Sequence, residues 1–141
     1  MVSSRPLRVA SQSTAPGAFV LQRRCASVSN QLWGEIDLRN GYYRIAVKHT
    51  GLCLEVNQAG GTEGKGNNAR LLQWHCHGLE QQQWEKAFIG GGYFHYVNRR
   101  SGKCIEVNQS GSTKGLGNGL AIIQQTCNGS VFQQWRLRTP K

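Results

Sequence analysis

Hydrophobic residues occur along this chain in short runs that glycine and polar residues interrupt. The clearest runs occupy residues 42–47, 53–56, 70–74 and 83–86. Short runs that are rich in β-branched and aromatic side chains and bounded by Gly and Asn are typical of β-strands. No segment keeps the helical period for three turns. The pattern therefore predicts an all-β protein built from short strands.

The same pattern returns after 51 residues. When residues 41–84 are aligned with residues 92–135, 19 of the 44 positions are identical, with no gap. The longest block is Cys-Leu-Glu-Val-Asn-Gln at residues 53–58, which recurs as Cys-Ile-Glu-Val-Asn-Gln at residues 104–109. Self-similarity at a fixed period indicates a repeat architecture.

A third and more divergent copy precedes these two. Three residue types set its register because they recur 51 positions apart: Cys25, Cys76 and Cys127; Gln31, Gln82 and Gln133; Trp33, Trp84 and Trp135. We expect one domain of three repeats, at about residues 1–40, 41–91 and 92–141, with four short strands in each. Closing these strands into a body with threefold pseudosymmetry removes the sheet edges that an open sheet would expose.

Charge is distributed unevenly over the repeats. The chain carries 17 Lys and Arg against 7 Asp and Glu, a net charge of +10, of which residues 92–141 contribute +6. Nucleic acid, an acidic glycan and an anionic surface are natural partners for such a charge, and a soluble basic surface is the alternative. No apolar stretch of about 18 residues is present, so we expect no membrane span.

The start of the chain allows two interpretations. Residues 1–34 contain no acid and several Arg and Ser, which is typical of a transit peptide, but the register of Cys25, Gln31 and Trp33 favours a first repeat. No apolar core of a signal peptide is present in the chain. The strand at residues 41–47 maps, in the first repeat, to a position before Met1, so we expect that strand to be missing. Another chain, a rearranged N-terminus or residues 136–141 would replace it, or the gap would stay open.

Several short motifs carry a resemblance to a known family. The second repeat reads Cys-Leu-Glu-Val at residues 53–56, Gln-Trp-His-Cys at 73–76 and Gln-Gln-Gln-Trp at 81–84, and the first keeps Leu-Arg-Val at 7–9 and Asn-Gln-Leu-Trp at 30–33. From about residue 6 to residue 138 the chain resembles the ricin-type β-trefoil lectins, which also occur as carbohydrate-binding modules attached to glycosidases. The resemblance implies a β-trefoil of six hairpins, carbohydrate binding and no cofactor.

The tryptophans that recur in all three repeats are expected in the core. Each buries roughly 200 Å², and we expect Trp33, Trp84 and Trp135 to anchor their repeats to the shared centre. Gln31, Gln82 and Gln133 are expected to satisfy buried backbone groups near a turn.

The resemblance implies that two glutamates and one tryptophan contact a sugar. Glu55 and Glu106 stand where the family has its sugar-binding Asp, and Trp74 stands where it has a stacking aromatic. A carboxylate accepts strong hydrogen bonds from adjacent hydroxyls. The alternatives are a solvated Glu at a strand edge and a Trp that only packs.

The second repeat is the best candidate site, with Glu55, Trp74 and Gln81, and with Asn57 and Gln82 as helpers. The third repeat keeps Glu106 and Asn108 but has Gln125 for the aromatic and Phe132 for the family's Asn. The first repeat has Arg8 for the acid and Arg23 for the aromatic, so we expect it to bind no neutral sugar.

The cysteines follow the same organisation. In the resembled family, equivalent cysteines are paired within each repeat, which implies the disulfides Cys53–Cys76 and Cys104–Cys127, each stabilising by about 3 kcal/mol. Pro6 stands at the position of the third partner, so Cys25 is expected to be free. Disulfides imply an oxidising compartment and secretion, and five reduced cysteines are the alternative. Cys76 with His75 and His77 lacks a second ligand pair for zinc, so we expect no metal.

The sequence favours two binding functions over a catalytic one. Glycoside hydrolysis needs two carboxylates about 5–10 Å apart, whereas Glu55 and Glu106 belong to different repeats, so we expect no enzyme. The first hypothesis is binding of a galactoside-like or xylan-like carbohydrate, beside a fused or associated toxin or glycosidase domain. The second is a basic interaction trefoil that holds an anionic partner such as an acidic glycan through Arg99, Arg100, Lys103 and Lys114. We do not expect nucleic acid as the partner.

Overall fold

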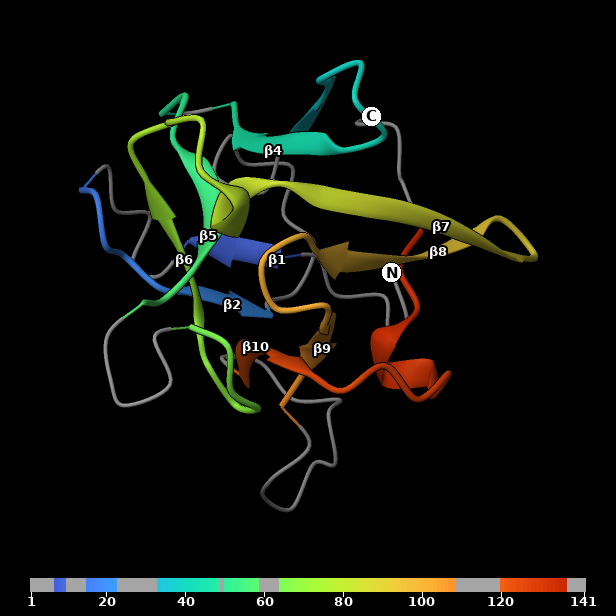
Figure 1. Ribbon diagram of the computed structural model, residues 1–141. Helices are drawn as coiled ribbons and strands as arrows, with labels where there is room; N and C mark the ends of the chain where they lie inside the picture. Colours follow the sequence, from blue (N-terminus) through green and yellow to red (C-terminus); the bar gives the residue numbers. More distant parts are fainter. Residues whose placement is uncertain are drawn as a thin grey trace.

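Antiparallel strands of three to seven residues form the regular structure of the protein. The computed structural model describes residues 7–9 (backbone), 15–22, 33–48, 50–58, 64–108 and 120–136 (Figure 1). The strands found there are β1 (Leu7–Val9), β2 (Val20–Gln22), β3 (Trp33–Asp37), β4 (Tyr43–Val47), β5 (Cys53–Val56), β6 (Leu71–Trp74), β7 (Trp84–Gly90), β8 (Tyr93–Asn98), β9 (Cys104–Val107) and β10 (Leu120–Gln125). Single 3-10 turns, η3 (Glu80–Gln82) and η4 (Val131–Gln133), follow β6 and β10.

Strand pairing repeats with the same 51-residue period as the sequence. The order in the sheet is β1-β2-β10-β9-β8-β7-β4-β5-β6, with β3 paired to β4. In the β5–β6 hairpin Cys53 lies opposite Trp74, and in the β9–β10 hairpin Cys104 lies opposite Gln125. The β3–β4 and β7–β8 hairpins share their register in the same way. The all-β fold and the repeated hairpins expected of a β-trefoil are therefore present.

Equivalent residues of the three repeats meet in the core. Val20, Leu71 and Ile122 are 51 positions apart and all are inaccessible to solvent. Trp84 and Trp135 are also buried, and their indole N–H groups donate to the carbonyls of Leu54 (3.3 Å) and Ile105 (3.0 Å). Trp33 is partly buried and packs against this cluster. The core role expected for the recurring tryptophans is thus confirmed for Trp84 and Trp135, with Trp33 at the margin.

A second set of recurring residues joins neighbouring repeats. Gln22, Gln73 and Gln124 are 51 positions apart and fully buried. The Gln73 side chain donates to the Ala15 carbonyl (2.8 Å) in the first repeat, and Gln124 donates to the carbonyl of Gly66 (2.9 Å) in the second. Buried polar side chains are stable only when they are hydrogen-bonded. Gln73 and Gln124 therefore attach their hairpins to the loop of the preceding repeat.

A polar cluster links β3, β7 and β8. Glu35 accepts hydrogen bonds from Lys86 (3.3 Å) and Tyr96 (3.3 Å). Burial and the adjacent Glu35 carboxylate raise the pKa of the Tyr96 hydroxyl well above its ordinary value. The hydroxyl consequently stays protonated and donates to Glu35.

One strand is longer than the sequence predicts. The run at residues 83–86 predicts a strand that ends at Lys86, whereas β7 continues to Gly90 (Figure 1). Pairing with β8 causes the extension, because Phe88 lies opposite Phe94 and Gly90 opposite Tyr93. Three glycines with positive φ, residues 90–92, then turn the chain. This pairing across two repeats is not visible in the local pattern.

Both expected disulfides are present, Cys53–Cys76 and Cys104–Cys127. The expectations about a free Cys25 and about the replacement of the first strand fall on residues outside the described ranges. No helix among the described residues is long and apolar enough to cross a bilayer.

The buried and exposed tryptophans are predicted to differ in their effect on stability. Trp84→Phe removes volume from the core and leaves the Leu54 carbonyl without its donor, so it should lower the free energy of unfolding by about 2 kcal/mol. Trp74→Phe, at a 40% exposed position, should cost less than about 0.5 kcal/mol. Urea unfolding with intact disulfides measures both values. Equal losses would contradict this description of the core.

Candidate functional site

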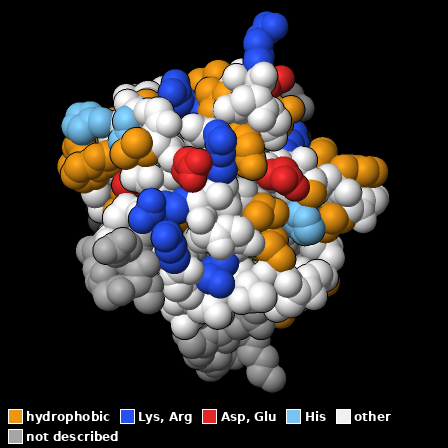
Figure 2. All heavy atoms as spheres, in the orientation of Figure 1, with side chains coloured by type: hydrophobic (Ala, Val, Ile, Leu, Met, Phe, Trp, Pro, Cys, Tyr) orange, Lys and Arg blue, Asp and Glu red, His pale blue; other side chains and the backbone are white. Residues whose placement is uncertain are grey.

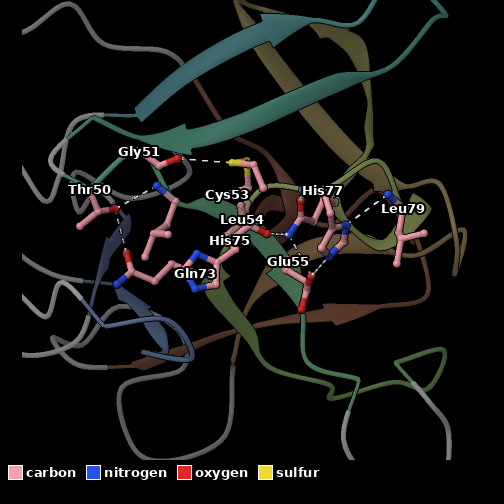
Figure 3. The surroundings of a disulfide bond; sticks show 12 residues. Thr50, Gly51, Cys53, Leu54, Glu55, Gln73, His75, His77 and Leu79 are labelled. Atoms are coloured by element: carbon pink, nitrogen blue, oxygen red, sulfur yellow. Dashed lines mark hydrogen bonds and ion pairs between the residues drawn. A yellow bond between two sulfur atoms is a disulfide. The ribbon is translucent and has the colours of Figure 1, made fainter.

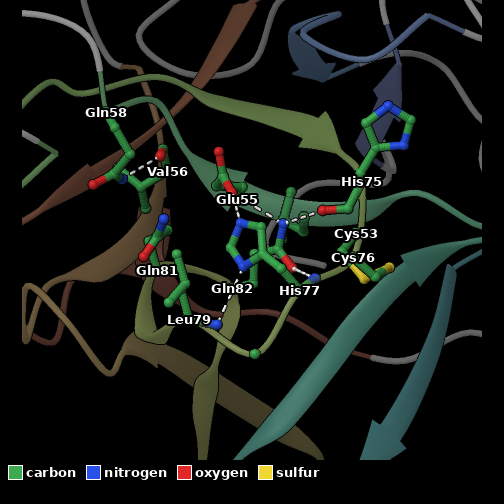
Figure 4. A network of polar contacts seen from close by, with 12 residues as sticks. Cys53, Glu55, Val56, Gln58, His75, Cys76, His77, Leu79, Gln81 and Gln82 are labelled. Carbon is green, nitrogen blue, oxygen red and sulfur yellow. Dashed lines mark hydrogen bonds and ion pairs between the residues drawn. A yellow bond between two sulfur atoms is a disulfide. The ribbon is translucent and has the colours of Figure 1, made fainter.

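The side chain of Gln82 organises the end of the second repeat. Its amide nitrogen donates to Glu55 Oε1 (2.9 Å) and to the His75 carbonyl (2.8 Å), and its oxygen accepts from the His77 N–H (2.9 Å). Both amide protons and the carbonyl oxygen are thus used (Figure 4). Gln82 therefore fixes the turn after β6 and the carboxylate of β5 together.

His77 provides the second contact to this carboxylate. Its Nδ1 accepts a hydrogen bond from the Leu79 N–H (3.1 Å), so Nδ1 carries no proton. The proton of the neutral ring is then on Nε2, which donates to Glu55 Oε1 at 2.8 Å. Two donors converge on Oε1, and the described residues hydrogen-bond only to that oxygen. The other carboxylate oxygen points away from both donors in Figure 4.

The third repeat has the same framework without the histidine. Gln133 donates to Glu106 Oε1 (3.0 Å) and to the Thr126 carbonyl (2.9 Å), and it accepts from the Asn128 N–H (3.0 Å). Asn128, at the position of His77, accepts from the Ser130 N–H (2.9 Å), as His77 does from Leu79. The imidazole ring of His77 has a second nitrogen on its far side, and this nitrogen contacts Glu55. The described contacts of Asn128 stay within its own turn.

The Cys53–Cys76 disulfide joins the two segments that carry this contact. Cys53 lies two residues before Glu55 on β5, and Cys76 directly precedes His77. The Cys76 sulfur also lies 3.3 Å from the Gly51 carbonyl oxygen (Figure 3). The covalent link therefore limits the separation of the strand that holds Glu55 from the turn that holds His77.

Trp74 lies on the same face of the β5–β6 hairpin as Glu55. The register places Cys53 opposite Trp74 and Glu55 opposite Leu72. Since side chains alternate along a strand, Glu55 and Trp74 are diagonal neighbours on one face. The indole is 40% exposed, and Gly17 lies against its edge, where an added Cβ would be 3.5 Å from Cζ3. Trp74 is therefore partly packed and partly open to solvent, unlike the fully buried Trp84.

An open pocket of about 540 Å³ adjoins this group. In Figure 4, three of its lining residues, Gln58, Leu79 and Gln81, lie near Glu55 and His77. The lining residues are Gln58, Leu79, Glu80, Gln81 and Arg100. The site thus combines a fixed carboxylate, an exposed aromatic ring and a polar hollow.

Comparison with known proteins identifies the family. A sequence model described as the ricin-type β-trefoil lectin domain matches residues 2–135. The chain belongs to this family. Membership supports carbohydrate binding as the general function of the domain, in a fold that is typically non-catalytic. A comparison with curated proteins found no match.

Solved structures show the same fold. A designed threefold symmetric protein, ThreeFoil, is 34% identical with a TM-score of 0.85, over 96% of this chain and 91% of that one. An exo-β-1,3-galactanase from Clostridium thermocellum is 28% identical with a TM-score of 0.81, over 92% of this chain and 26% of that one. The C-terminal half of an earthworm R-type lectin, solved with GalNAc, is 14% identical with a TM-score of 0.64, over 94% of this chain and 88% of that one.

The residues that the sequence predicts at the lectin site differ from one another in their contacts. Glu55 contacts Gln82, and Gln81 lines the adjoining pocket. Asn57 is half-buried, and its N–H donates to the Arg70 carbonyl (2.8 Å). In the third repeat, Glu106 contacts Gln133, and the Asn108 N–H donates to the Ala121 carbonyl (3.0 Å). The side chain of Arg8, together with Arg23, Asn30 and Lys114, lies outside the described residues.

The alternative of solvated glutamates is wrong. Glu55 is 7% exposed and Glu106 is 3% exposed, and each accepts a hydrogen bond from a buried glutamine side chain. The expectation that the recurring Gln satisfies backbone groups near the turn is confirmed for Gln82 and Gln133. Sequence reasoning considered His77 only as a zinc ligand and missed its contact with Glu55. The one available signal was that His77 has the same spacing from Gln82 as Asn128 has from Gln133.

Arg99, one member of the basic cluster, is engaged within the structure. Its Nη1 donates to Gln83 (2.8 Å), its Nε lies 3.5 Å from Glu80, and the guanidinium lies 4.6 Å from the Tyr42 ring centre. On the face shown in Figure 2, Lys and Arg side chains lie among Asp and Glu side chains. The Arg99 guanidinium therefore links the third repeat to the second.

Removing the Gln82 amide is predicted to destabilise the domain strongly. Gln82→Leu takes hydrogen bonds from Glu55, the His75 carbonyl and the His77 N–H, and should lower the free energy of unfolding by about 2–4 kcal/mol. The neighbouring Gln81→Leu, at the pocket surface, should cost less than about 1 kcal/mol. Chemical unfolding of both variants measures the difference. A stable Gln82→Leu variant would show that the network does not hold the turn.

Proposed function

We propose that the second repeat binds a sugar at Glu55, with Trp74 stacking on the sugar face, Gln81 assisting and Gln82 holding the carboxylate in place. The observation that carries the proposal is that the two oxygens of the Glu55 carboxylate differ in their hydrogen bonds. Oε1 is held by Gln82 and His77, while the described residues leave Oε2 without a hydrogen bond. A fixed, charged acceptor forms strong hydrogen bonds with hydroxyl donors.

Aromatic stacking suits the other part of a sugar. A pyranose ring has a face of C–H groups, and the exposed indole of Trp74 can cover it while hydroxyls reach Glu55. Ligand sites combine such apolar surfaces with a few fixed polar groups. His77 adds to the proposal because it fixes the carboxylate orientation before any ligand arrives.

We propose the second repeat as the principal site and the third as a weaker one. Glu106 has the Gln133 contact but has Gln125 where the second repeat has Trp74. The Gln125 side chain accepts a hydrogen bond from the Asn68 N–H (2.9 Å) of the second repeat. A sugar at Glu106 would therefore lack both the stacking ring and the histidine.

The ligand class that we propose is a galactoside or a xylan-like saccharide. The similarity to part of a β-1,3-galactanase supports the former and also supports attachment to a larger glycosidase. A single shallow site binds weakly, and attachment to a larger chain raises the effective concentration. The two disulfides support an oxidising, extracellular compartment.

The second hypothesis, a basic interaction trefoil, has less support. Arg99 is committed to Glu80, Gln83 and Tyr42 rather than to a partner. A glycan array separates the two at low salt and at about 1 M salt, where the Debye length is about 3 Å. Binding of neutral saccharides that survives high salt and disappears in Trp74→Ala supports the sugar site. Binding confined to sulfated or uronic glycans and lost in high salt would favour the basic trefoil.

Matched variants of the two glutamates test where the sugar binds. Glu55→Gln turns the outward acceptor into an amide donor, and the lost charge should weaken binding by about tenfold or more. Glu106→Gln makes the same change beside Gln133 and should leave the affinity within about twofold. Calorimetric titration with the saccharide that the array selects measures both. If Glu106→Gln abolished binding while Glu55→Gln retained it, the assignment to the second repeat would be wrong.

A further inference from the structure

The pocket beside Glu55 is built from two repeats. Gln58, Leu79, Glu80 and Gln81 come from the second repeat, whereas Arg100 comes from the β8–β9 turn of the third. Leu79 connects the pocket to the proposed sugar site, since its N–H is the group that holds His77 Nδ1. A saccharide that extends beyond Glu55 on this side therefore meets Arg100.

Asn98 fixes the position of the Arg100 turn. The Asn98 side chain accepts from the Arg100 N–H (3.0 Å) and donates to the Gln81 carbonyl (3.0 Å). Asn98 is 1% exposed, so this link is protected from solvent. The equivalent residue of the second repeat is Val47, which has no polar group to make such a link. The bridge between Arg100 and Gln81 is thus particular to this junction.

The lining residues of the pocket include one acid, Glu80, and one base, Arg100. Glu80, the acid among the lining residues, lies 3.5 Å from Arg99 Nε, so a neighbouring cation offsets its charge. Arg100 contributes a guanidinium with five N–H donors in a planar fork, which can bind a carboxylate or sulfate in addition to contacts within the protein. The net charge of +10 also concentrates anionic ligands near the surface.

We infer that Arg100 forms an anionic subsite, so that the second-repeat site prefers a saccharide carrying a carboxylate or a sulfate next to the sugar at Glu55. The inference rests on the proposed sugar site and assigns the specificity of its extension. The neutral sugar supplies hydroxyls for Glu55 and a face for Trp74. The acidic substituent supplies the oxygens that Arg100 binds.

The test compares saccharides that differ only in charge. The probes are a xylo-oligosaccharide with and without a glucuronate branch, and a galactose disaccharide with and without a sulfate ester. Affinities are measured by calorimetry at about 50 mM and 500 mM salt for the unaltered protein, Arg100→Gln, Arg100→Lys and Lys48→Gln. Lys48 is an exposed cation of the second repeat at the position equivalent to Arg99, so its variant removes the same charge elsewhere.

The unaltered protein should bind at least one acidic probe about tenfold more tightly than its neutral counterpart, as expected for a charge-assisted hydrogen bond. Arg100→Gln should abolish this preference and leave the neutral affinity unchanged. Arg100→Lys should keep part of it, and Lys48→Gln should keep all of it. Whether carboxylate or sulfate gives the larger gain identifies the natural substituent.

Three results would overturn the inference. Equal affinities for acidic and neutral probes would remove the anionic subsite while leaving the sugar site in place. An equal loss of preference in Lys48→Gln would reduce the effect to overall charge. Failure of the unaltered protein to bind any probe, neutral or acidic, would overturn the proposed sugar site itself.

Discussion

The side-chain amide of Gln82 joins the parts of the second repeat that form both the turn after β6 and the proposed binding site. It ties Glu55 on β5 to the carbonyl of His75 and the N–H of His77 after β6. Two residues later Trp84 enters the core and donates to the Leu54 carbonyl, beside Glu55 on the same strand. The Gln-x-Trp motif therefore couples the core to the site through one short turn. Because a buried amide must satisfy its donors, this geometry admits little variation.

The repeats share this framework but differ in what surrounds it. Gln133 and Glu106 reproduce the Gln82–Glu55 contact in the third repeat. The second repeat differs from the third in two residues close to Cys76 in the sequence, Trp74 and His77. The described part of the scaffold thus uses this glutamine in both the second and the third repeat, whereas the flanking positions differ. The candidate site of the second repeat therefore differs from the equivalent position of the third, although both share the same scaffold.

The sequence predicted the features that repeat and missed those that depend on contacts between distant segments. The 51-residue period was sufficient for the hairpins, the buried Trp84 and Trp135, and the role of Gln82. The extension of β7 to Gly90 required its pairing with β8, which no local pattern encodes. The contact of His77 depends on a turn that directs Nδ1 to Leu79 and leaves Nε2 for Glu55. The bridge of Asn98 between Arg100 and Gln81 spans two repeats and is visible only in three dimensions.

An NMR titration with the bound saccharide tests most directly whether a sugar binds over Glu55 and Trp74. The indole N–H of Trp74 and the backbone amides of Glu55, His77 and Gln82 should shift together along one binding curve. The indoles of Trp84 and Trp135 should not move, since both are buried and hydrogen-bonded to carbonyls. Shifts that gathered at Asn128 and Gln133, with Trp74 unaffected, would contradict the account.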